Sequence, residues 1–424
     1  MTVNVTDTVG ANNTIVLDGS SKIPAFDGSQ VTTLSATAFT TGTLATARID
    51  VGTTAGKILQ LDGNAKIPAI SGANLTNAPG PTVSTSDPAI DTNSTLGTKW
   101  INKTSGEVYI CIDATTGANV WTNVGAGSGD ITPWTYPGES YGYCAGGNAP
   151  GPTSNVIDKF SFTSQANATD VGDLTASGGS HCPNTSPTHG YCSGGAGLGA
   201  NIDKWSFASG GNAVDAGFNL SASRIFGAGG SSSTNGYCLA GSSGGPVVNT
   251  LDKFAFATSS NASDIGNATQ SRERLASHSS ETHGYGSGGS AAGASSPFYN
   301  IIEKYSFSSD GNATDVGNLT QSRSPDNGGA SSATDGHTVG GYQGGSSNVI
   351  DEFSFSSDGD STDVGDLVSA VRHGMCSSST GYGYFSGGYP STNTIQRWSF
   401  TSSGNSVDWA DLTQARLQGS GNQS

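Results

Sequence analysis

The sequence predicts an all-β protein, and three observations support that prediction. Gly supplies 63 of the 424 residues, and Gly, Ser, Thr and Asn are all unfavourable in helix interiors. Hydrophobic residues make up 33% of the chain and come in short bursts separated by turn-forming residues, which is typical of short strands. A strand-like phrase also recurs six times after residue 136. We therefore expect short strands and turns arranged as stacked sheets.

Residues 1–80 are expected to form a slender, β-rich shaft. The pattern Leu-Asp-Gly-x-x-Lys-Ile-Pro-Ala occurs twice, at Leu17–Ala25 and at Leu61–Ala69. Asp-Gly favours hairpin turns, and Pro24 and Pro68 are compatible with strand ends or edges. The apolar bursts are too short and too widely spaced to form a core within one chain. Such a region is expected to obtain its core by association, as an intertwined homotrimer.

Residues 83–125 predict a small, separate β module. The phrase KWINKTSGEVYICIDATTGANVWTNVG (99–125) reads as three strands with a Ser-Gly turn after the first. We expect its core to consist of Trp100, Val108, Ile110 and Trp121. The Gly-rich residues 126–135 are expected to link this module to the rest of the chain.

Residues 136–424 contain the repeat, whose most regular element is a strand with an aromatic centre. Its six copies begin about 48 residues apart and read IDKFSF (157–162), IDKWSF (202–207), LDKFAF (251–256), IEKYSF (302–307), IDEFSF (350–355) and IQRWSF (395–400). Each unit also carries Gly-Tyr or Gly-His, usually a Gly-Gly pair, and a polar closing phrase such as SSDGNATDVGNLTQSR (308–323). A unit of this length holds four short strands. One such sheet cannot bury a face alone, so the six sheets must stack on one another.

The two ends of the repeat region predict how the stack is completed. The first unit begins at ESYGYCAGG (139–147) without an Arg-led strand of its own. The last unit ends with ARLQGSGNQS (415–424), which is such a strand with nothing after it. We expect this C-terminal strand to complete the first sheet, because closure removes open sheet edges.

Charge and composition argue against several classes of function. The net charge is −16 and no basic patch is present, which argues against nucleic-acid binding. No stretch approaches the roughly 20 apolar residues of a membrane span, so no membrane insertion is expected. The N-terminus lacks the segments of a signal peptide, so the six cysteines are expected to be reduced. The alternative is a disulfide between Cys182 and Cys192 across one hairpin.

Two resemblances follow from these phrases. The Gly-Gly pairs and aromatic strands resemble the kelch repeat, a blade of the β-propeller, although the closing strand has the usual kelch Trp only at Trp409. The phrases GTLATARID (42–50) and LDGNAKIPAISGANLT (61–76), with the module at 99–125, resemble the tail-fibre proteins of marine and cyanobacterial phages. That resemblance implies an N-terminus anchored to phage tail or baseplate proteins, a trimeric shaft, and a distal six-bladed propeller. It also implies a place in the virion after assembly in the host bacterial cytoplasm.

Candidate binding residues lie where the six repeats differ. The loops between the second and third strands vary in length and sequence, and they are expected at the same end of each sheet as most of the Arg residues. Variable loops on a rigid scaffold are typical of recognition sites. Phe298, Tyr299, Tyr342 and Tyr389 are the candidate receptor-binding residues, because aromatic rings there can stack on sugars. The alternative is that these rings only pack locally.

Other chemistry finds less support in the sequence. His181, His278 and His373 lie on or near first strands, where a metal site is conceivable, but bonds to backbone or water are the expected role. The phrase DGNATD (310–315) suggests a calcium loop, yet Asx and Gly turn chemistry accounts for it better. No spaced metal-ligand motif, cofactor motif, nucleophile motif or unique pair of carboxylates is present. We therefore expect no metal, no cofactor, no catalytic residue and no enzymatic role.

The sequence thus predicts a phage tail fibre or adhesin whose propeller binds a glycan or protein of the host surface during adsorption. Two alternatives remain. The chain could be a structural head, neck or whisker fibre whose propeller docks other virion proteins, or it could be a glycan-cleaving enzyme.

Overall fold

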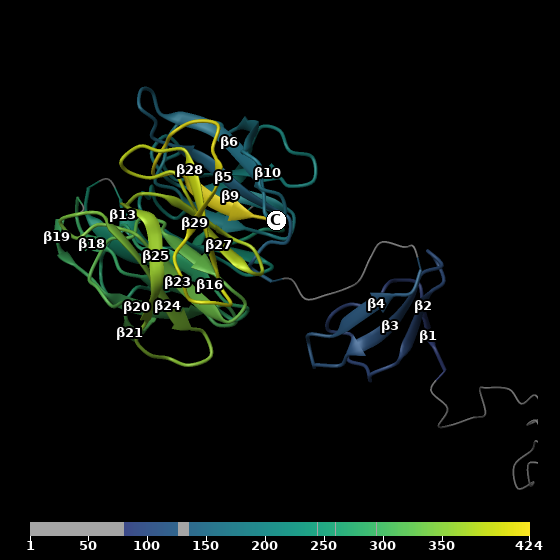
Figure 1. The fold of residues 1–424 in the computed structure, drawn as a ribbon. Helices are drawn as coiled ribbons and strands as arrows, with labels where there is room; N and C mark the ends of the chain where they lie inside the picture. The colour runs from purple at the N-terminus through teal and green to yellow at the C-terminus, as the bar shows by residue number, and fades with distance from the viewer. Residues whose placement is uncertain (1–79, 126–134, 244, 259, 294) are drawn as a thin grey trace, which may run out of the picture. The chain divides into compact units, whose positions relative to one another are not determined.

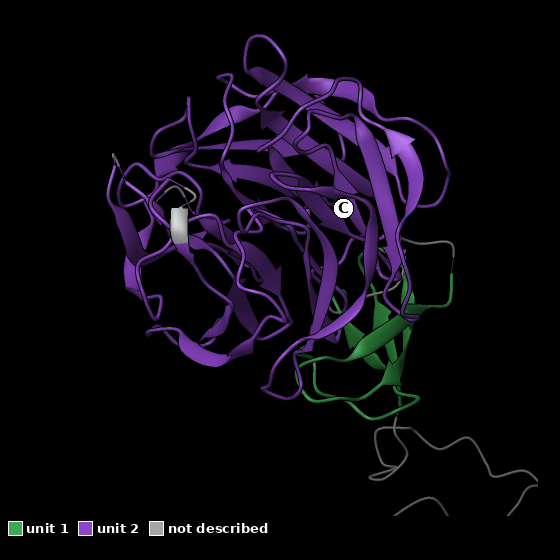
Figure 2. Ribbon diagram, turned by 60° about the vertical axis from the view of Figure 1, so that its left-hand side comes forward, with its two compact units in different colours: residues 1–131 green, residues 132–424 purple. Residues whose placement is uncertain are grey.

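The computed structural model describes residues 80–125 and 135–424, except residues 244, 259 and 294 (Figure 1). The chain divides into two compact units, Met1–Ile131 (unit 1) and Thr132–Ser424 (unit 2), which Figure 2 shows in different colours. The predicted shaft and its homotrimer fall on residues outside the described ranges. All regular elements of the described ranges are β-strands, so the all-β prediction is confirmed. No helix there is long and apolar enough to cross a membrane.

Unit 1 contains one four-stranded sheet. Its strands are β1 (Thr82–Ser84), β2 (Lys99–Asn102), β3 (Val108–Asp113) and β4 (Val120–Asn123), with β1 parallel to β2 and the others antiparallel. The core consists of Tyr109, Cys111 and Trp121, with Trp100 packed edge-on against Trp121 at 5.9 Å between ring centroids.

The expected contribution of Val108 and Ile110 to this core was wrong, because both side chains remain partly exposed. The strand register explains the difference. Trp100 pairs with Tyr109 and Trp121 pairs with Cys111, and paired residues share one face of a sheet. The two Trp side chains therefore lie on the same face of the sheet as Tyr109 and Cys111, and this face is the buried one.

Unit 2 contains six four-stranded antiparallel sheets, which we number in chain order. Sheet 1 consists of β30 (Ser420–Gln423), β5 (Tyr141–Gly147), β6 (Ser154–Ser161) and β7 (Thr169–Asp173). Sheet 2 consists of β8 (Cys182–Thr185), β9 (His189–Ser193), β10 (Asn201–Ser206) and β11 (Val214–Asn219). Sheet 3 consists of β12 (Ala228–Ser231), β13 (Asn235–Ser242), β14 (Val247–Ala255) and β15 (Ser263–Asn267).

The remaining sheets follow the same order. Sheet 4 consists of β16 (Ala276–Ser279), β17 (His283–Ser287), β20 (Ile301–Ser306) and β21 (Thr314–Asn318), with the short hairpin β18 (Ser290–Ala291) and β19 (Ser295–Phe298) between β17 and β20. Sheet 5 consists of β22 (Gly329–Ser331), β23 (Asp335–Val339), β24 (Ser347–Ser354) and β25 (Thr362–Val371). Sheet 6 consists of β26 (Met375–Ser378), β27 (Tyr382–Ser386), β28 (Thr394–Ser399) and β29 (Val407–Asp411).

The repeated aromatic strand joins each sheet to the one before it. In sheet 2, Trp205 and Phe207 pack against Tyr143 of sheet 1, with 4.9 Å between the Phe207 and Tyr143 ring centroids. The same contact recurs at every later step, and Phe162 of sheet 1 stacks on Tyr384 of sheet 6 at 4.7 Å. The partners are the aromatic residues of the Gly-Tyr and Gly-His pairs, namely Tyr143, Tyr191, Tyr237, Tyr285, His337 and Tyr384.

The Gly of the Gly-Tyr pair has a packing role. A Cβ at Gly190 would lie 2.3 Å from the ring of Trp205, and a Cβ at Gly383 would lie 2.1 Å from the ring of Trp398. Such distances are well inside van der Waals contact, so a side chain would displace the aromatic ring of the neighbouring strand. The motif therefore places a Gly beneath the sheet's own aromatic residue and a Tyr against the next sheet.

The closing phrase of each sheet is hydrogen-bonded to the sheet before it. In the phrase at 308–323, the Asn312 side chain accepts a hydrogen bond from the backbone N–H of Asn267 in sheet 3, at 3.0 Å. Equivalent acceptors stand at the other five steps, and the last joins Asn167 of sheet 1 to the N–H of Asp411 in sheet 6 at 3.1 Å. The six acceptors are Asn167, Asn212, Asn261, Asn312, Asp360 and Asn405. We call this hydrogen bond between sheets the Asx latch. The phrase repeats because each junction between sheets uses the same hydrogen bond.

The C-terminal strand pairs with the first sheet, as the chain ends predicted. Strand β30 runs antiparallel to β5, with Ser420 opposite Ala145 and Gln423 opposite Gly142. The same segment also contacts sheet 2, because Asn422 donates a hydrogen bond to the carbonyl of Asn184 at 2.6 Å. The contacts of Phe162 with Tyr384 and of Asn167 with Asp411 join sheets 6 and 1 in the same way as the other neighbouring sheets.

Candidate binding face

Three of the four predicted binding residues lie together at one end of sheets 4, 5 and 6. The Phe298 ring, at the end of β19, packs edge-on against Tyr342 with 5.6 Å between centroids. The guanidinium carbon of Arg372 lies 4.3 Å from the centroid of Tyr342 and 4.5 Å from that of Tyr389. Phe298, Tyr342, Arg372 and Tyr389 thus form one continuous row, which we call the aromatic row.

Paired backbone bonds hold the two tyrosines of the row in place. Tyr342 exchanges two backbone hydrogen bonds with Ser324, and Tyr389 exchanges two with Arg372. Each Tyr directly follows a Gly-Gly pair with positive φ, which is 62° and 110° at Gly340 and Gly341. Gly adopts such angles readily, so the pair turns the chain out of the second strand and into the bridge. The loops of the row therefore have rigid bases.

Tyr299 does not belong to this row. Its backbone N–H bonds to the carbonyl of Gly289, and its own carbonyl accepts a hydrogen bond from the N–H of Arg323. Its side chain is only partly exposed. The sequence singled out Phe298 and Tyr299 alike as aromatic residues of a variable loop, but the ring that packs against Tyr342 is that of Phe298.

Most of the Arg residues expected at this end are buried inside the sheets. Arg224, Arg272, Arg323 and Arg416 are almost fully buried, and each forms an ion pair with an acid of the aromatic strand: Asp252 at 3.2 Å, Glu303 at 2.7 Å, Asp351 at 3.0 Å and Asp158 at 2.9 Å. These Arg residues are structural. Their guanidinium groups bond within the fold and are not offered to a ligand.

Arg372 differs from these four because it is displaced by one residue. The carbonyl of Val371 accepts the N–H of Gly341, just as the carbonyl of Arg323 accepts that of Gly289. Val371 therefore holds the position of the buried Arg in sheet 6, and an uncharged Gln396 replaces the acid. Arg372, one residue further along, lies in the aromatic row instead. Sequence spacing alone did not separate it from the structural Arg residues.

The buried histidines make hydrogen bonds within the fold, as expected. His278 donates from one ring nitrogen to the carbonyl of Ala330 at 3.0 Å, and its other nitrogen meets the hydroxyls of Ser287 and Thr338. Burial lowers the pKa of His278 to about 4 and that of His337 to about 3, so both are neutral. Among the described residues, no group of three His, Cys, Asp or Glu side chains could hold a metal ion.

A polar cluster lies where the chain enters the first strands. Asp326 accepts hydrogen bonds from Arg274 at 2.8 Å, from Gln418 at 3.2 Å and from His373. Although burial opposes it, the bond from His373 together with the charges of His373 and Arg274 lowers the pKa of Asp326 to about 2. The donors of the cluster thus bond to a carboxylate of the same chain, and the cluster joins sheets 4, 5, 6 and 1.

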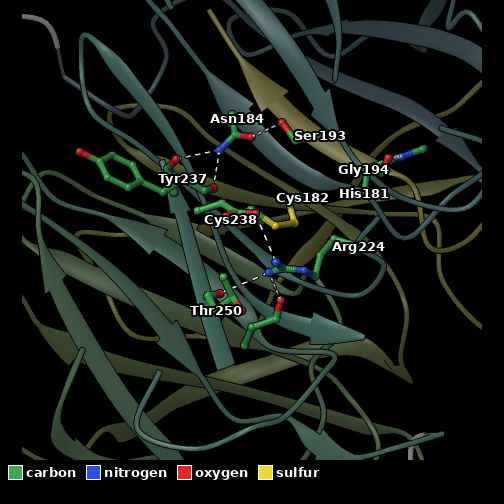
Figure 3. The surroundings of a disulfide bond; sticks show 12 residues. His181, Cys182, Asn184, Ser193, Gly194, Arg224, Tyr237, Cys238 and Thr250 are labelled. Atoms are coloured by element: carbon green, nitrogen blue, oxygen red, sulfur yellow. Dashed lines mark hydrogen bonds and ion pairs between the residues drawn. A yellow bond between two sulfur atoms is a disulfide. The ribbon is translucent and has the colours of Figure 1, made fainter. Parts of the chain in front are cut away.

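The cysteines pair differently from the hairpin alternative. Cys182 forms a disulfide with Cys238, while Cys192 is free and buried (Figure 3). The bond links β8 of sheet 2 to β13 of sheet 3, beside the buried Arg224. The alternative pair of Cys182 with Cys192 was wrong because the two residues are not opposite each other on the hairpin. Cys182 lies opposite Ser193, and Cys192 lies opposite Pro183. The bond also contradicts the expectation that all six thiols are reduced.

The acids of the phrase DGNATD do not form a cation site. Asp310 pairs with Lys253 of sheet 3 at 2.9 Å, and the equivalent Asp358 pairs with Lys304 of sheet 4 at 2.6 Å. Asp315 accepts a hydrogen bond from the N–H of Gly317 in its own turn. These carboxylates pair with a lysine or with their own backbone, which supports the turn interpretation of the phrase.

The opposite end of the sheets carries a cavity of about 610 Å³ near the start of unit 2. Its lining includes Tyr136, Tyr141, Pro187 and Phe207. Nothing in the sequence indicated this cavity, because its residues come from the entry segment and from turns that repeat with little change. No cluster of charged or nucleophilic side chains marks it in the sequence.

Comparisons with known proteins do not identify a family. Neither the protein-family models nor the curated proteins give a match. Among solved structures, the chain resembles one described as "Structure of YjhT", with 15% sequence identity and a TM-score of 0.48. That similarity covers 58% of this chain and 88% of the other. It is too distant to support a conclusion about function.

Proposed function

We propose that the six sheets of unit 2 are the blades of a kelch-like β-propeller that β30 closes. Support comes from two contacts that recur at every junction: the aromatic packing and the hydrogen bond to an Asx side chain of the closing phrase. The junction of sheets 6 and 1 carries the same set, through Phe162 with Tyr384 and Asn167 with Asp411. The sheets of unit 2 in Figure 2, arranged around a common centre, are consistent with this architecture.

We further propose that this propeller is the receptor-binding head of a phage tail fibre and binds a glycan of the host surface. The observation that carries the proposal is the aromatic row, which lies on loops that differ among the six repeats. Tyr389 is 47% exposed, and exposed aromatic rings provide faces on which sugar rings stack. Under this proposal the chain is a homotrimer held by residues 1–80, and three heads raise a weak single-site affinity by avidity. We propose no enzymatic role.

Adsorption to host cells tests the proposal. The full-length protein, fluorescently labelled, should bind host bacteria, and the double variant Tyr342→Ala with Tyr389→Ala should lose most of that binding. Tyr382→Ala is the matched control, because Tyr382 is also exposed and stacks with an Arg at the other end of the same sheet. Equal adsorption by all three proteins would refute a role for the aromatic row.

The same assay distinguishes the structural alternative. A fibre whose propeller docks other virion proteins would not adsorb to cells. It would instead be recovered with those proteins from assembled particles, through the same face. Release of reducing sugar from host polysaccharide by the full-length protein would favour a glycan-cleaving enzyme.

A further inference from the structure

The guanidinium of Arg372 differs from the other Arg side chains of sheets 3 to 5 and sheet 1 in having no acidic partner. In the described ranges, ion pairs join Arg224, Arg272, Arg323 and Arg416 to buried carboxylates, and none joins Arg372 to an acid. Its Nε is buried without a hydrogen-bond partner, as is the Nε of each of these four residues, so the difference lies in the missing carboxylate. A guanidinium carries five N–H donors in a planar fork. This group therefore has donors that the fold does not use.

The aromatic row determines how those donors are presented. Tyr342 and Tyr389 each place a ring against the Arg372 guanidinium. Stacking of this kind occupies the faces of the cation and leaves its N–H edges to make hydrogen bonds. The backbone bridge between Arg372 and Tyr389 holds the side chain and one of its rings on a common base. The guanidinium of Arg372 is therefore held in place before any ligand binds.

The position is also specific to sheet 6. The equivalent backbone bridges of other sheets are made by Leu417, Ile225, Glu273 and Ser324. None of these residues carries a positive charge, so the cation does not belong to the repeat. Because the fold can form this bridge without an Arg, folding does not require the charge at residue 372.

We propose that Arg372 binds the carboxylate of an acidic sugar, such as a uronic or sialic acid, whose ring lies against Tyr389. The planar fork of Arg matches a carboxylate through two parallel N–H···O bonds. The net charge of −16 favours a singly charged group over a doubly charged phosphate, because the field of the whole protein repels polyanions. This inference rests on the proposed glycan-binding function and specifies its ligand class.

A glycan array tests the inference with the full-length protein. The array carries oligosaccharides with uronic and sialic acids, their methyl esters, phosphorylated glycans and neutral glycans. Wild-type protein should bind the free acids at least about tenfold more tightly than their esters, since a charge-assisted bidentate bond is lost on esterification. Arg372→Gln should bind free acid and ester equally, and Arg372→Lys should show an intermediate preference.

Arg397→Gln is the matched control. Arg397 also stacks on two aromatic rings, those of Tyr382 and Trp409, but it lies at the other end of sheet 6. Its loss changes the net charge equally, so acid preference should remain. Near-ultraviolet circular dichroism checks that the aromatic packing of each variant is intact.

The outcomes separate this inference from the proposed function. If acids and esters bind equally well and Tyr389→Ala abolishes both, the carboxylate is not recognised, but glycan binding by the row stands. A preference for phosphorylated glycans would also overturn the inference. If no glycan binds and no cell adsorbs the protein, the proposed function itself is wrong.

Discussion

The pair Arg416 and Asp158 offers a sharp test of how the first sheet is completed. Both side chains are 0% exposed, and the Arg416 guanidinium donates to Asp158 at 2.9 Å, to the carbonyl of Cys144 at 2.7 Å and to that of Val156 at 2.8 Å. Arg416 precedes β30, whereas Asp158 lies in β6. We propose three variants for a double-mutant cycle: Arg416→Val, Asp158→Gln, and both together.

The two single variants should each be strongly destabilised. Removing one partner of a buried ion pair typically costs about 3–5 kcal/mol, because the other charge stays buried. We expect Arg416→Val to lower the free energy of unfolding by about 3 kcal/mol, because Asp158 keeps two hydrogen bonds from Thr413. Sheet 2 supports the lower value, since Asp203 there is buried with bonds from Thr175 and with Gly178 at the Arg position.

The double variant should recover most of the loss. It reproduces a pair found in sheet 6, where Val371 and Gln396 occupy the positions equivalent to Arg416 and Asp158. There Gln396 accepts a hydrogen bond from the N–H of Val368 at 2.7 Å. Replacing both members of a buried ion pair is often close to neutral. We therefore expect the double variant to lie within about 2 kcal/mol of the wild type, with a coupling energy of about 3 kcal/mol or more.

Urea unfolding of the full chain, followed by Trp fluorescence, measures these differences. Trp409 is a suitable probe because its indole N–H bonds across the junction to the carbonyl of Ser161. Gln396→Asp is the reverse control in sheet 6 and should destabilise, since no Arg is present there to pair with it. If the double variant loses as much stability as the two single variants combined, the pair is not coupled and this reasoning fails.

Three further predictions test the latch, the buried histidines and the disulfide. Asn312→Ala should cost about 1 kcal/mol in urea unfolding, while Asp310→Ala, which removes an exposed ion pair, should cost less than about 0.5 kcal/mol; equal losses would argue against the latch. His278 has a folded pKa of about 4, below its ordinary 6.5, so its contribution is complete above about pH 6.5 and about 3 kcal/mol is lost as the pH falls to about 4. His278→Gln should flatten that part of the stability–pH profile, and an unchanged slope would rule out His278 as its source. Thiol titration of the unreduced, denatured protein should find the four free cysteines, whereas six would show that Cys182 and Cys238 are not joined.

The sequence predicted the repeat architecture well because its signal is periodic. Six aromatic strands and their Gly-Tyr pairs define the sheets, and the ends of the repeat region correctly predicted the pairing of β30 with β5. The turn interpretation of the closing phrase was also correct, but its acceptor role was not foreseen. Hydrogen bonds such as that between Asn312 and Asn267 join different repeats, and a comparison of repeats with one another does not show which atoms meet.

The candidate site was predicted only in part. Phe298, Tyr342 and Tyr389 stood out because aromatic residues interrupt polar, variable loops. The sequence placed Arg372 at the same end of the sheets as Arg224, Arg272 and Arg323 and did not distinguish it from them, because a shift of one residue changes its environment completely while its spacing hardly changes. The disulfide was missed for a related reason, since Cys182 and Cys238 belong to neighbouring sheets and are 56 residues apart in sequence.

Hydroxyl-radical footprinting of the full-length protein on host cells would show which end of the sheets contacts the cell surface. Tyr389 and Tyr382 lie at opposite ends of sheet 6 and are 47% and 39% exposed, so their oxidation rates in the free protein should be comparable. Binding through the aromatic row predicts that Tyr389 becomes protected on the cells while Tyr382 and Tyr141 stay reactive. Protection of Tyr382 and Tyr141 with Tyr389 still reactive would place the binding surface at the other end of the sheets and contradict the account.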